Sequence, residues 1–376
     1  MARLGDVVKI EASSKRVVGD KFWLLNLDMV EQQTGNIIDY NYVGKDVLNG
    51  SIIQFDTGCV LYSKLRPNLN KVVIPSQDGF ATSEMLPLRP DTKMLTREYL
   101  TAFLRSDSFV TWAVSKTAGA KMPRLGSREL LDKELPLPSI TEQTRIAAQF
   151  AKVGELIALR REQLAKLDQL VKSRFVELFG DCNKQTSIKE SGLTISDGNY
   201  SSKYPRSEEF VESGIPFIRA NNLKNGTVVD EDMYFITAEK HNILLKGHLR
   251  PNDVLITTRG NIGQVAIVPE KHNDSNINAQ IVLLRDKNGR FVPQYLLWAL
   301  QTEEVKAQYI ELQTGTALKQ LPVGRLEQVM IKEPQVDLQK QFAAFVEQTD
   351  KSKLAIQQSL DKLETLKKSL MQEYFG

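Results

Sequence analysis

The residues with the clearest chemical potential are basic side chains in stretches that hold no acid. Residues 57–77, 108–128 and 312–326 contain no Asp or Glu. Their cations are Lys64, Arg66, Lys71, Lys116, Lys121, Arg124, Arg128, Lys319 and Arg325. Basic side chains without neighbouring carboxylates attract phosphate groups, as a nucleic-acid footprint does. Each stretch is also compatible with an ordinary solvated loop, and the choice between the two stays open at this level.

Patterns for catalysis and metal binding are missing from the sequence. It holds no Asn-Pro-Pro-Tyr or Asp-Pro-Pro-Tyr tetrapeptide, no Gly-x-Gly-x-x-Gly after a strand and no Gly-x-x-x-x-Gly-Lys-Ser/Thr loop. His241, His248 and His272 have no Cys or acidic partner at zinc-ligand spacing. Gly260-Asn-Ile-Gly263 resembles a phosphate cradle, but its place in a predicted hairpin favours a plain turn. We therefore expect no catalytic residue and no metal site, and a chain that binds without catalysing.

Length and composition favour two domains. A chain of 376 residues is too long for one ordinary core. Hydrophobic residues make up 41% and charged residues 25%, with a net charge of +3, which is a soluble globular composition. No apolar run reaches the length of a membrane helix, and the first residues lack the apolar core of a signal peptide. The only cysteines, Cys59 and Cys182, fit a reducing compartment, so we expect a cytoplasmic protein without membrane contact.

The chain also carries an internal repeat. Residues 141–180 and 337–376 each have the pattern of one long amphipathic helix that ends in Phe-Gly, and they are offset by 196 residues. The same offset relates Gly119/Gly315, Leu125/Leu321, Leu130/Leu326, Pro138/Pro334, Gln143/Gln339 and Leu164/Leu360. A register that persists through a Gly loop, a Pro and a terminal Gly indicates a duplication. It predicts a domain at 1–140, a helix at 141–180, a second domain at 181–336 and a second helix at 337–376.

Each predicted domain starts with strands and continues with a short helix. Residues 60–74 and 254–268 match as strand–loop–strand segments. Helical spacing of aromatic residues predicts one short helix near Glu98–Ser115 and another near Pro293–Leu312. Strands of the first domain are predicted at Val7–Ile10, Phe22–Leu27, Ser51–Phe55, Cys59–Leu61 and Lys71–Ile74.

The long helices require a partner along their length. Each would run for about 37 residues, or roughly 55 Å at 1.5 Å per residue. Thr141 and Asp337 are the predicted N-caps. Apolar residues follow steps of three and four along both helices, so each helix exposes a stripe that must be covered. Antiparallel pairing of the two helices is the simplest solution, and a homodimer through either helix is the alternative.

Several of these features together resemble a known family. The segment Gly214-Ile-Pro-Phe-Ile-Arg-Ala-Asn-Asn-Leu223, the loops Thr117–Lys121 and Thr314–Ala317, and the duplicated helices resemble the specificity (S) subunit of type I restriction-modification enzymes. The resemblance implies an α+β fold: two α/β target recognition domains in pseudo-twofold repeat, separated by two long helices that form an antiparallel coiled coil.

The resemblance also implies a function and a set of partners. Each domain would read one half of a bipartite double-stranded DNA target, and the helices would act as a spacer. The helices would also dock modification (M) subunits, two of them, and through these the restriction (R) subunits. No cofactor is expected on this chain, whereas S-adenosylmethionine, ATP and Mg belong to the partner subunits. The alternatives are a stand-alone DNA-modifying enzyme with a cryptic active site and a coiled-coil adaptor without DNA function.

Under this interpretation the DNA-binding residues lie in the hairpin loops and the acid-free stretches. Arg suits paired hydrogen bonds to guanine and Asn to adenine, whereas Lys mostly contacts phosphates. The candidates are Lys64, Arg66, Lys121 and Arg124 in the first domain, and Arg219, Asn221, Arg259, Asn261 and Lys319 in the second.

Overall fold

The chain divides into two compact units. The computed structural model describes residues 1–15, 18–48, 51–119, 121–200, 203–316 and 318–376. Unit 1 comprises Met1–Gln163 and Ile356–Gly376, and unit 2 comprises Leu164–Ala355. Ala120 and Ala317, which belong to the two predicted Thr-x-Gly-x loops, lie outside the described residues. Within the described ranges, no helix is long and apolar enough to cross a membrane.

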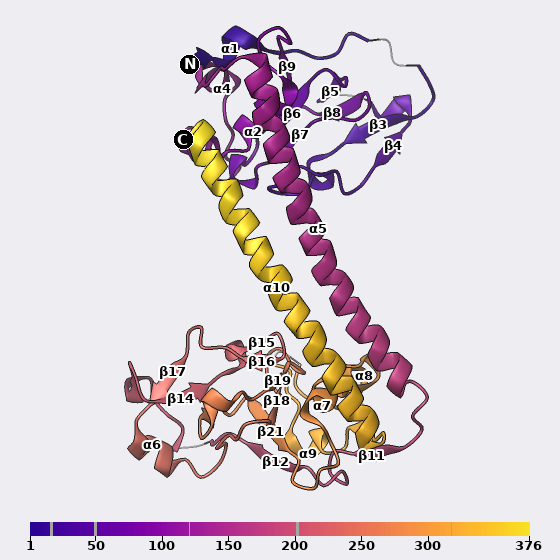
Figure 1. Cartoon of the computed structure of the whole chain (residues 1–376), viewed down its shortest axis with the longest axis vertical. Helices are drawn as coiled ribbons and strands as arrows, with labels where there is room; N and C mark the ends of the chain where they lie inside the picture. The colour runs from indigo at the N-terminus through magenta and orange to yellow at the C-terminus, as the bar shows by residue number, and fades with distance from the viewer. Residues whose placement is uncertain (16–17, 49–50, 120, 201–202, 317) are drawn as a thin grey trace. The chain divides into compact units, whose positions relative to one another are not determined.

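Two four-stranded sheets form the centre of unit 1 (Figure 1). One has the strand order β2-β9-β6-β7, the other has the order β4-β3-β8-β5, and β1 pairs with β10. The strands are β1 Ala2–Arg3, β2 Val8–Ile10, β3 Phe22–Leu25, β4 Asn41–Val43, β5 Ile52–Phe55, β6 Val60–Ser63, β7 Val72–Val73, β8 Gly79–Thr82, β9 Met85–Pro90 and β10 Glu134–Leu135. Each strand predicted for this domain overlaps one of these, so those predictions are confirmed.

Unit 2 repeats this plan with a larger first sheet. Its sheets have the orders β12-β21-β18-β19-β16-β15 and β13-β17-β14-β20, and β11 pairs with β22. The strands are β11 Gln185–Ser187, β12 Thr194–Asp197, β13 Phe210–Val211, β14 Ile215–Ile218, β15 Leu223–Lys224, β16 Thr227–Val228, β17 Tyr234–Ile236, β18 Val254–Thr257, β19 Val265–Ile267, β20 Asn276–Ile277, β21 Ile281–Arg285 and β22 Met330–Lys332. The antiparallel pairs β6–β7 and β18–β19 are the two matching hairpins that the sequence predicted.

The prediction of one short helix in each domain is wrong, because each region forms two helices. The first region forms α2 Arg97–Leu104 and α3 Asp107–Ser115, and the second forms α7 Pro293–Ala299 and α8 Glu303–Leu312. The other short helices are α1 Leu4–Val7 and α4 Ser127–Asp132 in unit 1, and α6 Ala238–Ile243 and α9 Val323–Leu326 in unit 2. The Ser106 hydroxyl accepts the Phe109 amide, and Thr302 does the same for Val305. Each hydroxyl caps a new helix, so the chain turns between α2 and α3 and between α7 and α8.

The long helices are α5 Ile140–Phe179 and α10 Val336–Phe375, and each unit contains part of both. Both helices begin one residue earlier than predicted, so Thr141 and Asp337 lie inside their first turns and not at the N-caps. At the start of α5 the Ser139 hydroxyl accepts the Glu142 amide instead.

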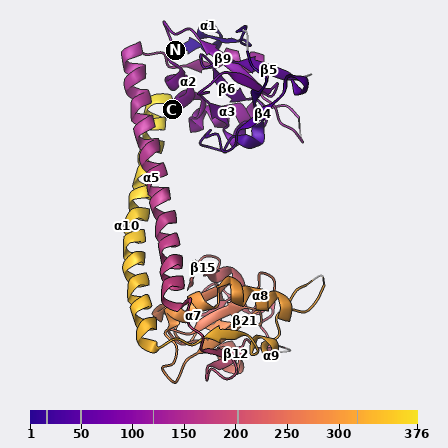
Figure 2. The ribbon, with the colours of Figure 1, turned by 90° about the vertical axis from the view of Figure 1, so that its right-hand side faces the viewer.

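The two long helices lie side by side and antiparallel within each unit (Figures 1 and 2). In unit 1, Arg161 is 2.8 Å from Glu364. In unit 2, Lys353 is 2.6 Å from Asp168. Residue numbers that rise along α5 therefore face numbers that fall along α10, which confirms the predicted antiparallel pair.

A buried glutamine attaches each long helix to its unit. Gln143 accepts the Thr96 amide at 2.9 Å and donates to the carbonyls of Met94 at 2.8 Å and Pro138 at 2.9 Å. Gln339 makes the equivalent bonds, accepting from Val292 at 2.8 Å and donating to the carbonyls of Arg290 at 3.0 Å and Pro334 at 2.9 Å. Every partner is displaced by the repeat offset, so the duplication extends to individual hydrogen bonds.

The end of the opposite long helix completes each hydrophobic core. In unit 1, Phe375 of α10 packs its ring 5.3 Å from Tyr99 and 5.8 Å from Phe150 of α5. In unit 2, Phe179 of α5 packs 4.7 Å from Tyr295 and 5.6 Å from Phe342 of α10. The Phe of each terminal Phe-Gly therefore belongs to the core of the other half of the chain, whereas the glycine is exposed.

Each unit also contains a buried aspartate, just before its hairpin, that pairs with a partly buried arginine. Asp56 contacts Arg89 at 2.8 Å, and Asp253 contacts Arg285 at 2.6 Å. Burial favours the neutral form of Asp56, but hydrogen bonds from Arg89, Ser13 and the Gly58 amide outweigh it and hold the pKa well below its ordinary value. The hydrogen bonds that Arg285 donates to Asp253 raise the pKa of Arg285. Arg89 lies in β9 and Arg285 in β21, so each pair connects a strand to a residue before the hairpin.

Candidate nucleic-acid interface

The four DNA-binding residues predicted for the first domain lie on two adjacent loops. The β6–β7 loop carries Lys64 and Arg66, and residues 116–126 carry Lys121 and Arg124. The backbones of these loops pair directly: the Arg66 amide donates to the Pro123 carbonyl at 2.8 Å, and the Leu125 amide donates to the Lys64 carbonyl at 2.9 Å. Stretches far apart in sequence thus form one basic surface.

The side chains on this surface have different surroundings. Arg66 and Lys121 are exposed, and Lys64 is half-buried. Arg66 has a left-handed backbone, with φ at 49°, immediately before Pro67. Arg124 forms an ion pair of 3.1 Å with Glu84, which lies outside the acid-free stretches. The loop is therefore not free of acids in space, and the charge of Arg124 is partly compensated.

Unit 2 repeats the paired loops. The β18–β19 loop carries Arg259 and Asn261, and residues 313–321 carry Lys319; all three side chains are exposed. The Leu321 amide donates to the Thr258 carbonyl at 2.8 Å, as Leu125 does to Lys64 in unit 1. The second loop is closed by two bonds between Thr314 and Gln320, matching those between Ala118 and Arg124. The structure therefore brings three of the five predicted residues of this unit together.

Tyr200 was missed as a candidate and lies beside Arg259. The guanidinium of Arg259 is 5.2 Å from the Tyr200 ring centre, within cation–π range. The Tyr200 hydroxyl donates to the Ala279 carbonyl at 2.8 Å, which fixes the ring. Burial of the phenol raises its pKa. Because these residues are far apart in sequence, no local pattern signals the pair.

The remaining predicted residues, Arg219 and Asn221, lie on the turn after β14. Asn221 is exposed, whereas the guanidinium of Arg219 stacks 3.4 Å from the Tyr234 ring centre and donates to the Asp232 carbonyl at 2.7 Å. The Asn222 side chain accepts the Arg219 amide at 3.0 Å. Arg219 therefore stabilises its own turn and has less donor capacity for a ligand than Arg259.

The segment Gly260–Gly263 is a hairpin turn, as predicted. Gly260 and Gly263 have φ values of 73° and 87°, which favour glycine. The Gly263 amide donates to the Thr257 carbonyl at 2.9 Å, and the Thr257 hydroxyl donates to the Asn261 carbonyl. The segment positions Asn261 at the tip of the loop.

The fold gives two of the histidines an acidic partner. Asp274 lies 3.3 Å from His241 and 3.4 Å from His248. The carboxylate comes from a separate segment, which zinc-ligand spacing along the chain does not detect.

The fold and the paired basic loops define a class: a duplicated α+β protein with two long, antiparallel helices. The family model of the type I restriction modification DNA specificity domain matches residues 1–169 and 193–367. The chain belongs to this family, which confirms the predicted resemblance and the predicted fold class.

Individual relatives are more distant. The EcoDI specificity subunit of Escherichia coli is 28% identical over 177 residues, which cover 45% of this chain but only 39% of that subunit. The MjaVIII specificity subunit of Methanocaldococcus jannaschii is 23% identical over 316 residues, covering 78% of this chain and 72% of the relative. Both relatives are named as specificity subunits of type I restriction enzymes.

Solved structures share the fold over the whole chain. A chain from a study of complex assembly and conformational transition in the type I R-M system has a TM-score of 0.64 at 18% identity, and the match covers 100% of this chain and 96% of that chain. The type I restriction-modification S subunit from M. genitalium has a TM-score of 0.59 at 13% identity, with coverage of 100% and 95%. At these identities the similarity establishes the fold.

Proposed function

We propose that this chain is the DNA-reading subunit of a type I restriction-modification complex, in which each unit reads one half of a bipartite target. The observation that carries the proposal is the repeated pair of backbone-linked basic loops, joined through Leu125 and Lys64 in unit 1 and through Leu321 and Thr258 in unit 2. Family membership supports the same role.

The proposal assigns different tasks to different side chains. Exposed arginine and asparagine at hairpin tips reach base edges, where a good paired contact contributes about 1–3 kcal/mol of discrimination. Arg66, Arg259 and Asn261 have these types and positions. Lys121 and Lys319, on the adjoining loops, hold phosphates and contribute affinity without sequence preference.

Partners supply the chemistry in this proposal. M subunits, two of them, dock on the long helices and transfer methyl groups from S-adenosylmethionine, and R subunits join through them with ATP and Mg. The complex is cytoplasmic. Methylation assays on the chain alone and with M subunits test the division of labour: methyl transfer by the isolated chain would contradict the proposal and support a stand-alone enzyme.

Arg259→Ala tests the role of the unit 2 loop. Methylome sequencing of the host first identifies the split target, and binding is then compared on cognate, half-mutated and random duplexes. The variant should lose about 10- to 100-fold of its preference at one half-site and keep its affinity for random DNA. Arg66→Ala, the matched control, should affect the other half-site. Equal weakening on all duplexes would make Arg259 a phosphate contact, and unchanged binding on all of them would contradict the DNA-reading role of the loop.

The proposed spacer role is tested by changing helix length. Each long helix has 40 residues. Four residues inserted at matching points of α5 and α10 lengthen each by about 6 Å. The preferred gap between half-sites should grow by about one or two base pairs at 3.4 Å each. An unchanged gap would contradict the spacer role.

A further inference from the structure

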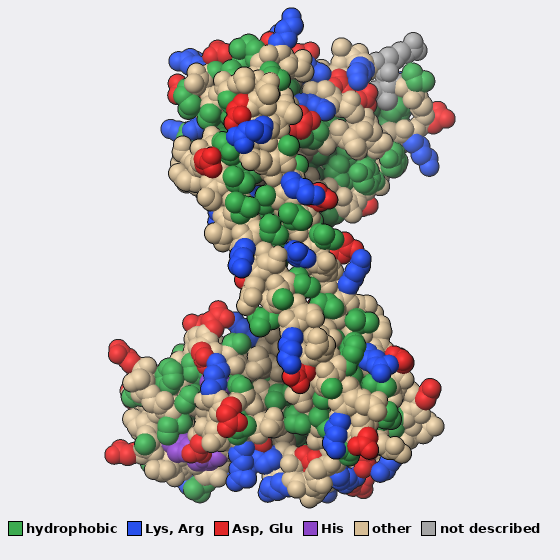
Figure 3. All heavy atoms as spheres, in the orientation of Figure 1, with side chains coloured by type: hydrophobic (Ala, Val, Ile, Leu, Met, Phe, Trp, Pro, Cys, Tyr) green, Lys and Arg blue, Asp and Glu red, His purple; other side chains and the backbone are tan. Residues whose placement is uncertain are grey.

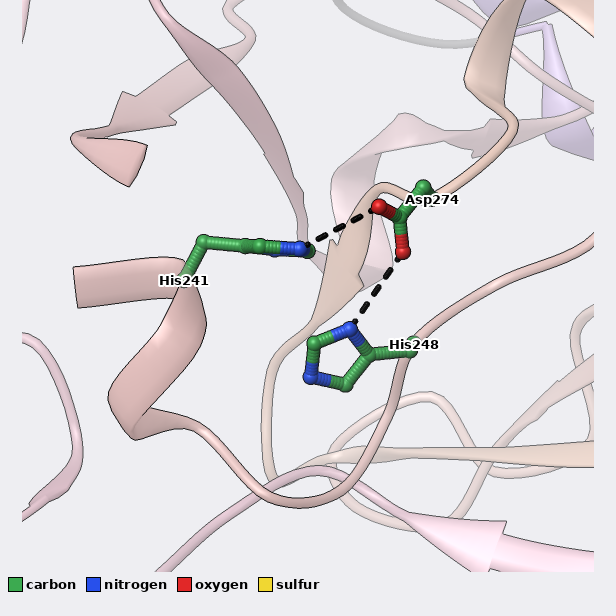
Figure 4. A group of neighbouring side chains, drawn as sticks. All are labelled: His241, His248 and Asp274. Atoms are coloured by element: carbon green, nitrogen blue, oxygen red, sulfur yellow. Dashed lines mark hydrogen bonds and ion pairs between the residues drawn. The ribbon is translucent and has the colours of Figure 1, made fainter. Parts of the chain in front are cut away.

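Two histidines of unit 2 converge on one carboxylate (Figure 4). His241 lies in α6, His248 follows that helix, and Asp274 precedes β20. The Nε2 of His241 is 3.3 Å from one carboxylate oxygen of Asp274, and the Nδ1 of His248 is 3.4 Å from the other. His241 is buried, whereas the Asp274 side chain is 67% exposed. Figure 3 shows histidine side chains reaching the surface of unit 2 beside acidic ones.

The bonds behind the two rings determine which nitrogens carry hydrogen. The Nε2 of His248 is 2.5 Å from the Leu244 carbonyl, which can only accept, so this nitrogen is protonated. In the neutral ring, Nδ1 then presents a lone pair to Asp274. The Nδ1 of His241 is likewise 2.5 Å from the Asn276 side-chain oxygen, which leaves a lone pair on Nε2. Two lone pairs and a carboxylate repel one another unless a metal cation lies between them or the rings take up additional protons.

Acceptors behind the rings are also what orients histidine ligands in metal sites. Such an acceptor fixes the tautomer and increases the basicity of the ligating nitrogen. Here a backbone carbonyl performs this task for His248 and the Asn276 amide group for His241. The arrangement therefore includes both the ligands and the groups that orient them.

The spacing of the ligand atoms fits tetrahedral coordination. Bonds of about 2.0–2.1 Å to a tetrahedral zinc ion place ligand atoms roughly 3.3–3.4 Å apart. An octahedral ion such as magnesium at about 2.0–2.1 Å would bring neighbouring ligands to roughly 2.9 Å and prefers oxygen. The nitrogen–oxygen separations of 3.3 and 3.4 Å, each to a different oxygen of Asp274, are in the tetrahedral range, and two imidazole ligands favour zinc over magnesium. The three ligand atoms all lie within 4.8 Å of one another.

We propose that His241 Nε2, His248 Nδ1 and the Asp274 carboxylate bind one divalent transition-metal ion of the zinc class. Water takes the fourth position, because the carboxylate side of the site is open to solvent. The proposal does not depend on the function proposed above, since it rests on the geometry of these side chains alone.

The ion would connect two segments that support the basic loop. The Leu249 amide donates to the Ser275 carbonyl at 2.9 Å, so the His248 segment already runs beside the start of β20. Beyond β20, the Gln280 carbonyl accepts the Thr258 amide at 2.7 Å, next to Arg259. A metal at Asp274 therefore stabilises the framework on which the loop of unit 2 rests.

Zinc binding to the full chain tests the proposal. The protein is purified without a polyhistidine tag, treated with a chelator and titrated with Zn²⁺ by calorimetry, and with Co²⁺ by visible absorption. One equivalent should bind, and Co²⁺ should give the ligand-field bands of a tetrahedral site. Asp274→Asn, which suits the left-handed backbone at this position, and His248→Gln should each weaken binding by about a hundredfold.

Asp230→Asn is the matched control. Asp230 is 3.0 Å from His272 and 2.5 Å from Lys271, so it faces one histidine and a cation in place of two histidines. This variant should keep the affinity of the unchanged chain, and circular dichroism should confirm that all variants are folded. Absence of zinc binding, or equal binding by Asp274→Asn, would overturn the proposal. So would nitrogen-15 spectra that show both rings doubly protonated with and without zinc, because the cluster would then be an ion pair.

Discussion

Replacing Phe375 with alanine should destabilise unit 1, although this residue stands next to the end of the chain. Its side chain is 6% exposed and packs against Tyr99, Phe103 and Phe150, with ring centres 5.3, 5.8 and 5.8 Å away. Truncating such a ring leaves a cavity between α2 and the two long helices. Buried Phe-to-Ala changes of this kind cost about 3–5 kcal/mol.

Hydrogen exchange shows which of the two units loses this stability. A loss of about 3–5 kcal/mol corresponds to roughly two to three and a half orders of magnitude in the opening equilibrium. The slowest amides of α2 should exchange faster by up to that factor, because they exchange through opening of unit 1. Amides of α7, in unit 2, should keep the rates of the unchanged chain.

Phe179→Ala provides the reciprocal experiment. Phe179 is 1% exposed and lies in the core of unit 2, so its truncation should accelerate exchange in α7 and leave α2 unchanged. Val176→Ala, at a position 65% exposed in the same helix, should affect neither. Faster exchange in α7 after Phe375→Ala, or no change in α2, would refute the conclusion that each helix end serves the opposite half of the chain.

Two further perturbations test the anchors and the charged pairs. Gln143→Leu removes three buried hydrogen bonds and should lower the unfolding free energy of unit 1 by on the order of 3 kcal/mol in urea titrations, whereas Gln339→Leu should affect unit 2 instead. Asp56→Asn should cost about 2 kcal/mol at neutral pH, because it removes the carboxylate that bonds to Arg89. The folded-state pKa of Asp56 is depressed, so the stability that Asp56 contributes is present above the ordinary Asp pKa of about 3.9 and is lost as pH falls below it. The difference in unfolding free energy between the variant and the unchanged chain should therefore shrink in acid. A difference that grows on acidification would contradict this assignment.

The sequence was sufficient for the features that depend on local pattern or on repetition. Heptad spacing predicted the long helices, and the offset predicted that α5 and α10 are equivalent. Predictions of where a helix begins were wrong at positions where one capping side chain determines the first residue of the helix. Ser106 and Thr302 divide one expected helix into two, because their hydroxyls cap a second one. The same kind of cap at Ser139 makes Thr141 an interior residue.

The candidate site was predictable only to the level of loops. Acid-free stretches located the loops, but their side-chain partners come from distant segments that no window along the chain contains. Glu84 compensates the charge of Arg124 in an ion pair. The guanidinium of Arg219 stacks on Tyr234 and donates to the Asp232 carbonyl. Long-range contacts of this kind also bring Tyr200 to Arg259.

The two copies agree where they hold the framework together and differ where they face solvent. The anchors Gln143/Gln339 and Tyr99/Tyr295 are identical and make equivalent bonds, since any change would leave buried polar groups unpaired. In the paired loops, by contrast, Arg124 of unit 1 occupies the place of Gln320 in unit 2. Two units that read the same DNA sequence would need the same side chains at these positions. Identical anchors with different loops are therefore what we expect of a duplicated protein whose halves read different parts of one target.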